Sequence, residues 1–200
     1  MSDKIVFKTG EATVLAKQGQ FTGAITEVLI GDVSGPVGSA FGSMLGRNIG
    51  YIYAEPGLSF TSFDHMMGRA EGYTRLFAVR ACNQMVRPAT VTVSKVVMRN
   101  KAFVDLYGGV VQPAVGDAVL DSVIEGVIPK EQANSLCCIF LVWLDPACAG
   151  EPRLDKKDLY RTNYEAAKLA LQRAIHDEAD LEQLIANRHK IRHEMFNPES

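Results

Sequence analysis

The sequence predicts an α+β domain, in which helices pack against a mostly antiparallel sheet. Strand-like and helix-like segments follow in the order strands, helix, strands, helix, strand, helix. The run "CCIFLVWL" is apolar throughout, which predicts a buried central strand. The segment "DKKDLYRTNYEAAKLALQRAIH" repeats its apolar residues at helical spacing and predicts the clearest helix of the chain.

The N-terminal part of the chain predicts strands, a glycine-rich corner and a helix. Residues 4–16 predict two short strands joined by a turn at Thr9-Gly10, and "GAITEVLIG" predicts the next strand. The corner, residues 31–38, has neither a GxGxxG nor a P-loop pattern, so a structural corner is favoured over a phosphate cradle. Pro36 suits the first turn of the helix that follows, with apolar residues at Phe41, Met44 and Leu45.

The middle of the chain predicts two more strands, a helix and the central strand. The segments "TRLFAV" and "ATVTVSKVVM" predict strands, the second because it is β-branched and alternating. A helix is expected from Val110 to Glu125, closed by Gly126, and a short helix has Pro129 in its first turn. The clearest helix follows the central strand, and its expected apolar face consists of Tyr160, Tyr164, Ala167, Leu171, Ala174 and Ile175.

Two segments differ from the rest of the predicted domain. Residues 46–72 are rich in glycine and aromatic residues without a clear period, which is typical of a functional loop or insertion. The C-terminal segment predicts a charged helix over about 177–196, with an apolar edge of Leu181, Leu184, Ile185 and Ile191. We therefore expect one domain over residues 1–176, with an insertion at about 46–72 and a helical extension at 177–200.

The composition is that of a soluble globular chain. The chain has 200 residues, of which 47% are hydrophobic and 22% charged, enough to bury a core. The net charge of −2 gives no reason to expect nucleic acid or an anionic membrane surface as a partner. No apolar run approaches the roughly 20 residues of a membrane helix, and the charged N-terminus does not resemble a signal peptide. We therefore expect a cytoplasmic protein.

Cysteine and histidine spacing predicts no metal site. The 4 cysteines form no CxxC pair and are expected to be reduced, with Cys137 and Cys138 on opposite faces of one strand. His189 and His193 would share a helix face, but HExxH is absent and no third ligand is evident. A solvated helix face is therefore favoured over a zinc site.

Four polar residues in apolar or unusual surroundings are candidates for a functional site. Glu27 interrupts an apolar strand face and is either a buried general acid or a carboxylate on an edge strand that faces water. Lys95 interrupts a β-branched strand, where it either protects an edge or reaches into a site. Gln112 is a hydrogen-bonding group early in a helix. His65, in the insertion, is either a group that titrates near neutrality or an ordinary loop side chain.

Five segments of the chain carry a specific combination of motifs. They are "GEA" at 10–12, "LIGDVSGPVGSAF" at 29–41, "RPATVTVSKV" at 87–96, "AVLDSVIEGVIPKEQANSL" at 118–136 and "DKKDLYRTNYEAAKLALQRA" at 155–174. Together, and in this order, these segments resemble the formaldehyde-activating enzymes over most of residues 10–176. The last two segments are the most specific.

The resemblance implies both a fold and a reaction. Members of the family join formaldehyde to tetrahydromethanopterin, which yields the methylene derivative and water. Their subunits are two-layer α+β domains of the ribosomal protein S5 domain 2-like type. They assemble as homopentamers, with the pterin in a cleft between neighbouring subunits. The resemblance therefore implies a carbon–nitrogen lyase of the hydro-lyase class that acts on formaldehyde and a reduced pterin, without a metal.

The resemblance also implies roles for individual positions. In the family, a histidine protonates the departing hydroxide, and the matching position here is Ile25. We consider Glu27 and His65 as replacements for that acid, and Glu27 also matches a ligand-contacting aspartate. The family's other ligand contacts, a leucine, a lysine, a threonine and a glutamine, match Phe77, Lys95, Val97 and Gln112.

Three functions are compatible with these residues. The first is an enzyme that condenses formaldehyde with tetrahydromethanopterin and uses Glu27 or His65 as its acid. The second is a non-catalytic paralogue that binds a reduced pterin or another C1 carrier and senses, stores or delivers it. The third is a structural or regulatory subunit that binds a partner protein through residues 46–72 and the charged C-terminal segment.

Overall fold

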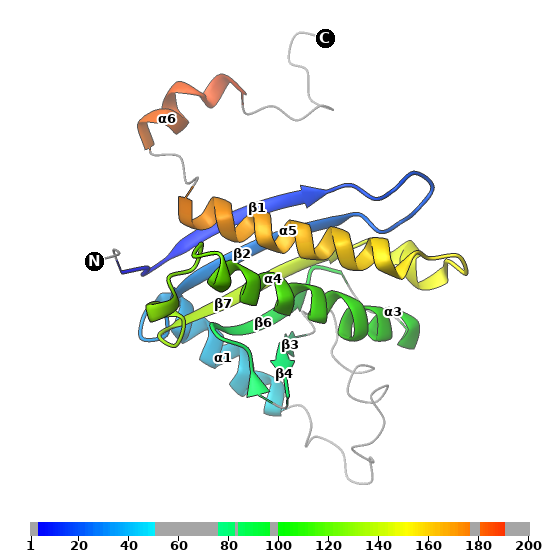
Figure 1. Ribbon diagram of the computed structural model, residues 1–200, viewed down its shortest axis with the longest axis horizontal. Coiled ribbons are helices and arrows are strands. Elements are labelled where there is room, and N and C mark those ends of the chain that lie inside the picture. Colours follow the sequence, from blue (N-terminus) through cyan, green and yellow to red (C-terminus); the bar gives the residue numbers. More distant parts are fainter. Residues whose placement is uncertain (1–3, 51–75, 83, 97–99, 177–180, 191–200) are drawn as a thin grey trace.

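A five-stranded sheet forms the centre of the computed structural model (Figure 1). The structure describes residues 4–50, 76–82, 84–96, 100–176 and 181–190. Within them the strand order is β1-β2-β7-β6-β3, and every neighbouring pair is antiparallel except β6 and β7. The strands are β1 (Lys8–Val14), β2 (Ala24–Asp32), β3 (Leu76–Ala78), β6 (Ala89–Ser94) and β7 (Leu136–Leu144). The predicted α+β fold with a mostly antiparallel sheet is confirmed.

The predicted central strand, β7, is paired on both sides and mostly buried. Its side chains alternate between two hydrophobic clusters, so Cys137 and Cys138 face opposite sides, as predicted. Burial raises the pKa of Cys137 to about 11 and also raises that of Cys138, so both thiols act as small hydrophobes. All four cysteines are free, and Cys82, between β4 (Arg80–Ala81) and β5 (Gln84–Met85), is exposed.

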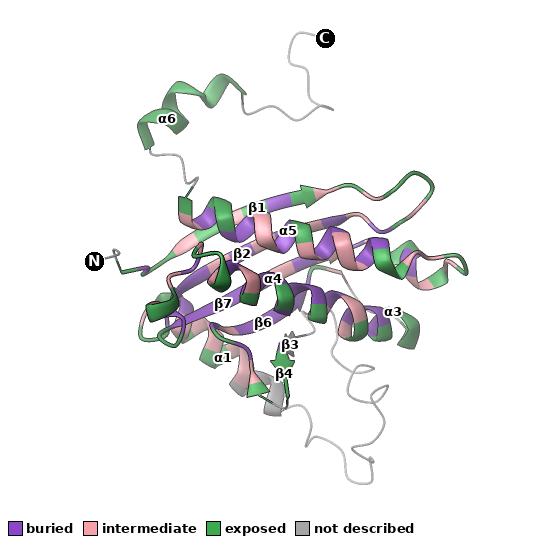
Figure 2. Cartoon of the chain, in the orientation of Figure 1, coloured by how far each residue is buried: buried purple, intermediate pink, exposed green. Residues whose placement is uncertain are grey.

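Two helices cover one face of the sheet. α5 (Lys156–His176) lies against β1 and β2, and α4 (Gln112–Ile124) lies beside α5 and contacts β6 (Figure 1). Figure 2 shows that buried residues follow the inner sides of these helices. Around α4, the fully buried apolar residues include Val111, Val115, Ala118 and Val119. These residues form one large core with the inner side chains of the sheet.

One helix lies on the opposite face of the sheet. α1 (Pro36–Gly50) begins at the predicted proline and packs against β2 and β7. Its Val37 belongs to a second, smaller apolar cluster with Val91, Val93, Cys137 and Ile139. Because this cluster involves only one end of the strands, α1 leaves part of this face uncovered.

The turn predicted at Thr9-Gly10 is wrong, because β1 runs straight through both residues. Glycine is a turn signal in a sequence, but in a strand it also permits a close approach of another backbone. A Cβ on Gly10 would overlap the carbonyl oxygen of Ala170 and crowd Ala174 in α5. The long helix therefore lies close to β1 because position 10 has no side chain.

The helix predicted from Val110 begins earlier than expected. α3 (Lys101–Leu106), a π-helical turn (Tyr107–Val111) and α4 follow one another without a break. Asn100 caps the start, because its side-chain oxygen accepts a 2.8 Å hydrogen bond from the amide of Phe103. The two glycines of "YGGVV" weaken the helical signal in the sequence, and the π turn accommodates them.

The connections on either side of β7 are short. Gly126, with φ +81°, ends α4 as predicted, and the short helix after Pro129 is a single 3-10 turn (Lys130–Gln132). A second 3-10 turn (Pro146–Gly150) follows β7. Asp145 caps it by accepting a 2.9 Å hydrogen bond from a backbone amide.

The predicted apolar face of α5 is buried at Ala167, Leu171 and Ala174, and it differs from the structure at the two tyrosines. Tyr160 and Tyr164 are half-buried, and the fully buried positions include Leu159, Thr162, Asn163, Ala166 and Ala170. The two tyrosine hydroxyls donate hydrogen bonds to Asp117 and Asp121 of α4. A tyrosine between two helices can pack its ring against the core while its hydroxyl binds a polar partner near the surface. Helical spacing in the sequence does not distinguish such a tyrosine from a fully buried one.

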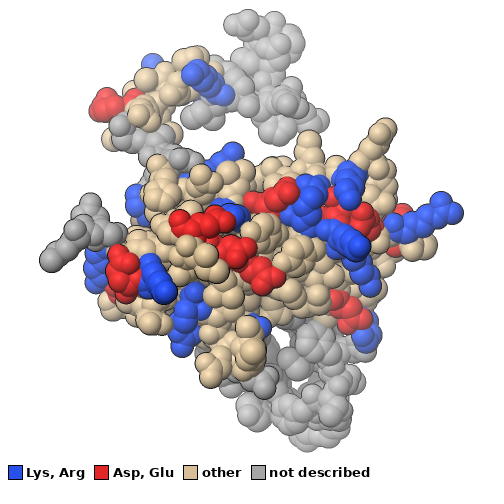
Figure 3. Space-filling model, in the orientation of Figure 1, with Lys and Arg blue, Asp and Glu red and all other residues tan. Residues whose placement is uncertain are grey.

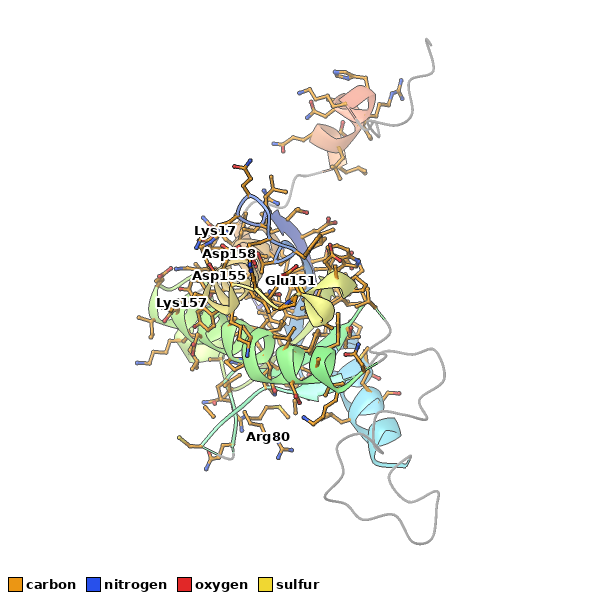
Figure 4. All side chains as sticks on the ribbon, turned by 90° about the vertical axis from the view of Figure 1, so that its right-hand side faces the viewer. Lys17, Arg80, Glu151, Asp155, Lys157 and Asp158 are labelled. Atoms are coloured by element: carbon orange, nitrogen blue, oxygen red, sulfur yellow. The ribbon has the colours of Figure 1, made fainter. Side chains whose placement is uncertain are left out.

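Asp158 joins the β1–β2 connection to the start of α5, where Figure 4 shows it beside Lys17 and Asp155. Its fully buried carboxylate accepts hydrogen bonds from the Lys17 amide (3.0 Å), the Thr22 hydroxyl and the Arg161 guanidinium (2.7 Å). Burial acts to raise the pKa of Asp158, but these hydrogen bonds outweigh it and lower the pKa to about 2. Asp155 caps the helix by accepting from its first amides.

The two segments predicted to differ from the domain are described only in part. Of the helix predicted over 177–196, the structure describes α6 (Leu181–Ala186) and a 3-10 turn (Arg188–Lys190). Residues 181–190 are all exposed, including Leu181, Leu184 and Ile185 of the predicted apolar edge, whereas Ile191 lies outside the described residues (Figure 2). The insertion predicted at 46–72 lies outside the described residues, except that its first residues end α1. None of the helices in the described ranges is both long and apolar enough to cross a membrane.

Candidate functional site

Strand β2 directs its side chains alternately to the two faces of the sheet. The residues that face α4 and α5 are buried, and they are Ala24, Thr26, Val28 and Ile30. The residues between them, Ile25, Glu27 and Leu29, are half-buried and point to the side of α1. The strand face predicted from the alternation of these three residues is therefore present.

Among the described residues, α1 covers one end of this side of the sheet and leaves the other end open. Leu29 packs against the cluster under α1, whereas the Glu27 side chain is 36% exposed. Strand β7 continues the open part of this surface. Leu141 lies opposite Glu27 and Trp143 lies opposite Ile25 in the antiparallel register, and both are half-buried.

Lys95 follows β6 directly and pairs with Glu27. Its backbone amide donates a 2.9 Å hydrogen bond to the carbonyl of Val142, which extends the pairing of β6 with β7. Its ammonium group donates a hydrogen bond to Oε1 of Glu27 across the intervening strand β7. We call the five residues of this surface the open face: Ile25, Glu27, Lys95, Leu141 and Trp143.

This arrangement differs from both alternatives considered for Glu27. β2 lies between β1 and β7, so Glu27 is not on an edge strand. Glu27 is also not enclosed by hydrophobic residues, because it is partly exposed and paired with Lys95. Lys95 follows an inner strand and reaches into the open face instead of protecting an edge. The sequence left these alternatives open because the two partners are 68 residues apart.

Position 25 has no group that can hold a proton. Ile25 is half-buried, and with Trp143 and Leu141 it borders the ion pair with apolar side chains on β2 and β7, whereas the exposed Glu11 of β1 lies opposite Glu27. The titratable side chains of the open face are therefore Glu27 and Lys95. An ion pair bordered by apolar side chains is less screened by water than one on a fully solvated surface.

Gln112 lies on the other side of the sheet from the open face. It is the first residue of α4, and its Nε2 donates a hydrogen bond to the carbonyl oxygen of Ala78 at the end of β3. Glu27 and Lys95 point instead to the side of α1. Within the described part of the chain, Gln112 therefore does not share a surface with the ion pair.

Phe77, Val97 and His65 complete the set of predicted site residues. The backbone of Phe77 belongs to β3 and lies opposite Thr92 of β6. Val97 and His65 lie outside the described residues, so their roles stay predictions.

In the described ranges, no group of three or more His, Cys, Asp or Glu side chains is arranged to hold a metal ion.

In the glycine-rich corner before α1, the Asp32 carboxylate is hydrogen-bonded by residues of the chain itself. Asp32 accepts from the amide of Ser34 (2.8 Å) and from its hydroxyl, and it forms a 3.0 Å ion pair with Lys4. These contacts lower the pKa of Asp32 to about 2, with the Ser34 hydroxyl as the largest cause. A Cβ on Gly31 or Gly38 would overlap neighbouring backbone carbonyl oxygens. The glycines therefore permit close packing, which supports a structural corner.

A groove of about 760 Å³ lies away from the open face. It is formed where the ends of α4 and α5 meet the segment before β1, and its lining includes Ile5, Val123, Ile124, Lys130, Ile175 and His176. Of the predicted site residues, the described ones Glu27, Lys95 and Gln112 do not line this groove. The candidate site is therefore the open face, because chemistry depends on the groups present more than on the size of a cavity.

The sequence did not indicate two residues of the open face, Leu141 and Trp143. Both lie in a strand that is apolar on both faces, so alternation does not reveal which side chains are partly exposed. The usable signal was the residue type, since the large amphipathic indole of tryptophan is seldom fully buried.

Comparison with known proteins supports the resemblance. The sequence profile described as "Formaldehyde-activating enzyme (Fae)" matches residues 54–196. A protein named "5,6,7,8-tetrahydromethanopterin hydro-lyase" from Methanosarcina barkeri is 37% identical over 123 residues, which cover 62% of this chain and 66% of that protein.

Longer relatives match nearly the whole chain. A "Bifunctional enzyme Fae/Hps" from Methanothrix thermoacetophila is 35% identical over 191 residues, which cover 94% of this chain and 41% of the relative. A protein of the same name from Methanosarcina mazei is 34% identical over 188 residues, with the same coverage. The chain thus spans about two fifths of the length of these bifunctional relatives. With the profile match over residues 54–196, these relatives show that the chain belongs to the formaldehyde-activating enzyme family.

Proposed function

We propose that this chain condenses formaldehyde with tetrahydromethanopterin or a related reduced pterin, as a carbon–nitrogen lyase of the hydro-lyase class. The observation that carries the proposal is the Glu27–Lys95 pair on the open face, in a chain of this family. Both positions match ligand contacts of the family, and both side chains are about one third exposed. They are therefore accessible to a ligand while the sheet holds their backbones in place.

The reaction requires positioning and one proton transfer. An amine of the pterin attacks formaldehyde and yields a carbinolamine, from which hydroxide is a poor leaving group without protonation. A second amine then closes the ring. Holding both reactants in place lowers the entropic barrier, and general acid–base assistance typically adds about 10²–10⁴-fold. On the open face, Trp143 and Ile25 offer an apolar floor for a flat ring, and the ion pair offers polar contacts.

We propose that the site is completed between subunits of a homopentamer. Glu27 and Lys95 face one side of the sheet, whereas Gln112 lies on the other. A neighbouring subunit that presents its α4 side to the open face would unite the three residues. Phe77 and Val97 would act as further ligand contacts, and His65 would lie in the insertion as a second candidate acid.

Mixed oligomers test whether the site is shared. Lys95→Met and Gln112→Ala should each be inactive alone. Subunits dissociated, mixed and reassembled should regain part of the activity, because some interfaces then combine an intact Lys95 with an intact Gln112. Light scattering gives the number of subunits. No recovery in mixed oligomers of confirmed composition would place the site within one subunit.

The activity itself is tested by the rate of condensation. Purified protein should consume formaldehyde and tetrahydromethanopterin faster than buffer alone, by about 10²-fold or more. A rate equal to that of buffer would remove the proposed reaction.

Residues 46–72 are a proposed surface for a partner protein, and a variant lacking them should keep its activity if they serve only that purpose.

A second function, a non-catalytic paralogue that binds a reduced pterin or another C1 carrier, is favoured by one observation. Ile25 stands where the family has its acid and lies opposite Trp143, so this position supplies packing in place of a proton. Such a protein would bind tetrahydromethanopterin or tetrahydrofolate in a calorimeter and leave the condensation rate unchanged. Binding of neither compound would exclude this function.

A further inference from the structure

In the ion pair of the open face, one side chain donates the hydrogen bond and the other accepts it. Nζ of Lys95 donates the hydrogen bond, and Oε1 of Glu27 accepts it. We propose that Lys95 is the proton donor of the reaction in this chain and that Glu27 positions it. The proposal rests on the proposed condensation, and it assigns the proton to Lys95 instead of to Glu27 or His65.

Lys95 retains donors for a ligand. An ammonium group carries three N–H donors, and among the described residues its one recorded side-chain partner is Glu27. Its side chain is 33% exposed, so its remaining donors are accessible from the solvent side. Glu27, as a carboxylate that accepts this hydrogen bond, has no proton to donate in the same arrangement.

Apart from carboxylates, the described side chains that lie beside Lys95 are apolar. Ile25 and Trp143 lie in register beside the ion pair, and Leu141 lies opposite Glu27. On the neighbouring strand β1, Glu11 lies opposite Glu27 and adds a second carboxylate. The described side chains of α1 carry no charge. The group of the open face that can both hold a proton and release it is therefore Lys95.

The proton transfers balance within one catalytic cycle. Lys95 gives a proton from Nζ to the hydroxyl oxygen of the carbinolamine as the C–O bond breaks, so that water leaves and an iminium ion forms. The second pterin amine attacks the iminium carbon, which forms the second C–N bond and leaves that nitrogen positively charged. This nitrogen returns its extra proton to the neutral Lys95 amine. The net reaction consumes formaldehyde and the pterin and releases one water.

Glu27 has a positioning role in this scheme. It fixes the ammonium group over the face shared by β2 and β7, and it stabilises the positive charge that returns to Lys95 at the end of the cycle. A glutamine at position 27 would still accept a hydrogen bond but would lose the negative charge. We therefore expect Glu27→Gln to slow the reaction less than the loss of an acidic proton at position 95.

Arginine at position 95 separates proton donation from ligand binding. Arg keeps the positive charge and the hydrogen-bond donors, but it does not release a proton in proteins. The experiment compares the wild type with Lys95→Arg, Lys95→Met and Glu27→Gln. Trp143 is the only tryptophan of the chain and lies on the open face, so its fluorescence reports pterin binding independently of turnover. The condensation rate is measured at pterin concentrations raised until it reaches a plateau for each variant.

The expected result is that Lys95→Arg still binds the pterin, by fluorescence, while its plateau rate falls by about 10²-fold. Lys95→Met should show the same loss of rate and weaker binding, and Glu27→Gln a smaller loss of rate. A plateau rate for Lys95→Arg within a few-fold of the wild type would overturn the role of Lys95 and leave the condensation reaction standing. A wild-type chain that does not accelerate the reaction would instead overturn the proposed function, whether or not it binds the pterin.

Discussion

The two faces of the sheet use polar side chains in opposite ways. On the helical face, Tyr160 donates to Asp117, Tyr164 to Asp121 and Lys168 to Glu125, so a ladder of polar pairs joins α5 to α4. Figure 3 shows charged side chains of both signs close together over these helices. On the α1 side, the pair Glu27–Lys95 has apolar neighbours on β2 and β7 and remains accessible.

The two faces differ in whether their polar groups are used in packing or remain available to a ligand. Burial and the Asp117 carboxylate raise the pKa of Tyr160 to about 12, and the hydrogen bond to Asp121 raises that of Tyr164. Both hydroxyls therefore stay protonated near neutral pH and serve packing. The Glu27–Lys95 pair, by contrast, lies on the sheet and does not connect two helices. The comparison predicts that substitutions on the helical side change stability, whereas those on the open face change chemistry.

The largest loss of stability is expected at Asp158, the buried carboxylate that joins the β1–β2 connection to α5. Asp158→Ala leaves Thr22 and Arg161 without their acceptor and should cost about 3 kcal/mol of unfolding free energy. Lys157→Ala, at the exposed neighbouring position, should cost much less. Urea unfolding measures both, and similar losses for the two variants would contradict the role given to Asp158.

Low pH should weaken the contacts of Asp158 in the wild-type protein as well. The pKa of Asp158 in the folded protein is about 2, below its ordinary value of 3.8. Its contribution to stability is therefore complete above about pH 4 and is lost as the pH falls towards 2. Asp32, with a pKa of about 2, acts in the same range and direction. Stability measured from pH 6 to pH 2 should fall in the acid range, and less steeply in Asp158→Asn.

Gly10→Ala should separate α5 from β1. The added Cβ overlaps a backbone carbonyl oxygen, which cannot move without displacing the helix, so we expect a loss of about 2 kcal/mol. Gly42→Ala is the matched control, because a Cβ at Gly42 meets nothing within 4 Å. That substitution lies in a helix and should stabilise the protein slightly. Equal thermal stabilities for the two variants would show that Gly10 does not set the packing distance.

Ile25→His should affect chemistry and leave stability nearly unchanged. It restores a side chain that titrates near neutrality beside Glu27, and we expect the condensation rate to rise about 10-fold. Ile25→Leu is the control, since it keeps the apolar contact opposite Trp143. An unchanged rate for Ile25→His, in a variant that still binds the pterin, would show that position 25 no longer faces the reacting atoms.

The smallest effect is expected in the polar ladder. Tyr164→Phe keeps the aromatic ring and removes the hydroxyl that donates to Asp121 at 2.7 Å, which should cost about 1 kcal/mol. Tyr160→Phe removes the corresponding hydrogen bond to Asp117 and should cost a similar amount. The condensation rate should not change in either variant. A change in rate without a change in stability would mean that the helical face also takes part in the chemistry.

Local signals predicted the elements of this fold better than their packing. The alternation of "GAITEVLIG" and the apolar run "CCIFLVWL" correctly indicated β2 and β7. Gly10 was misinterpreted because a glycine that permits a close helix looks the same in a sequence as one that permits a turn. Tyr160 and Tyr164 were expected in the core because their spacing is helical, although their hydroxyls bind α4.

The candidate site was predictable one residue at a time but not as a unit. Alternation in β2 and the resemblance to the family both indicated Glu27, and the resemblance indicated Lys95. Their pairing depends on the order β2-β7-β6 and on a register between strands far apart in the chain. No periodicity within a segment contains that information.

The sequence by itself determined the family and the identity of most strands and helices. These properties depend on residue type and on neighbours a few positions away, which a sequence records directly. Only the tertiary structure decided which side of the sheet is covered, that Glu27 accepts from Lys95, and that Trp143 lies beside them. Those properties arise because burial of the whole core selects one strand order and one register, and this selection places distant residues together.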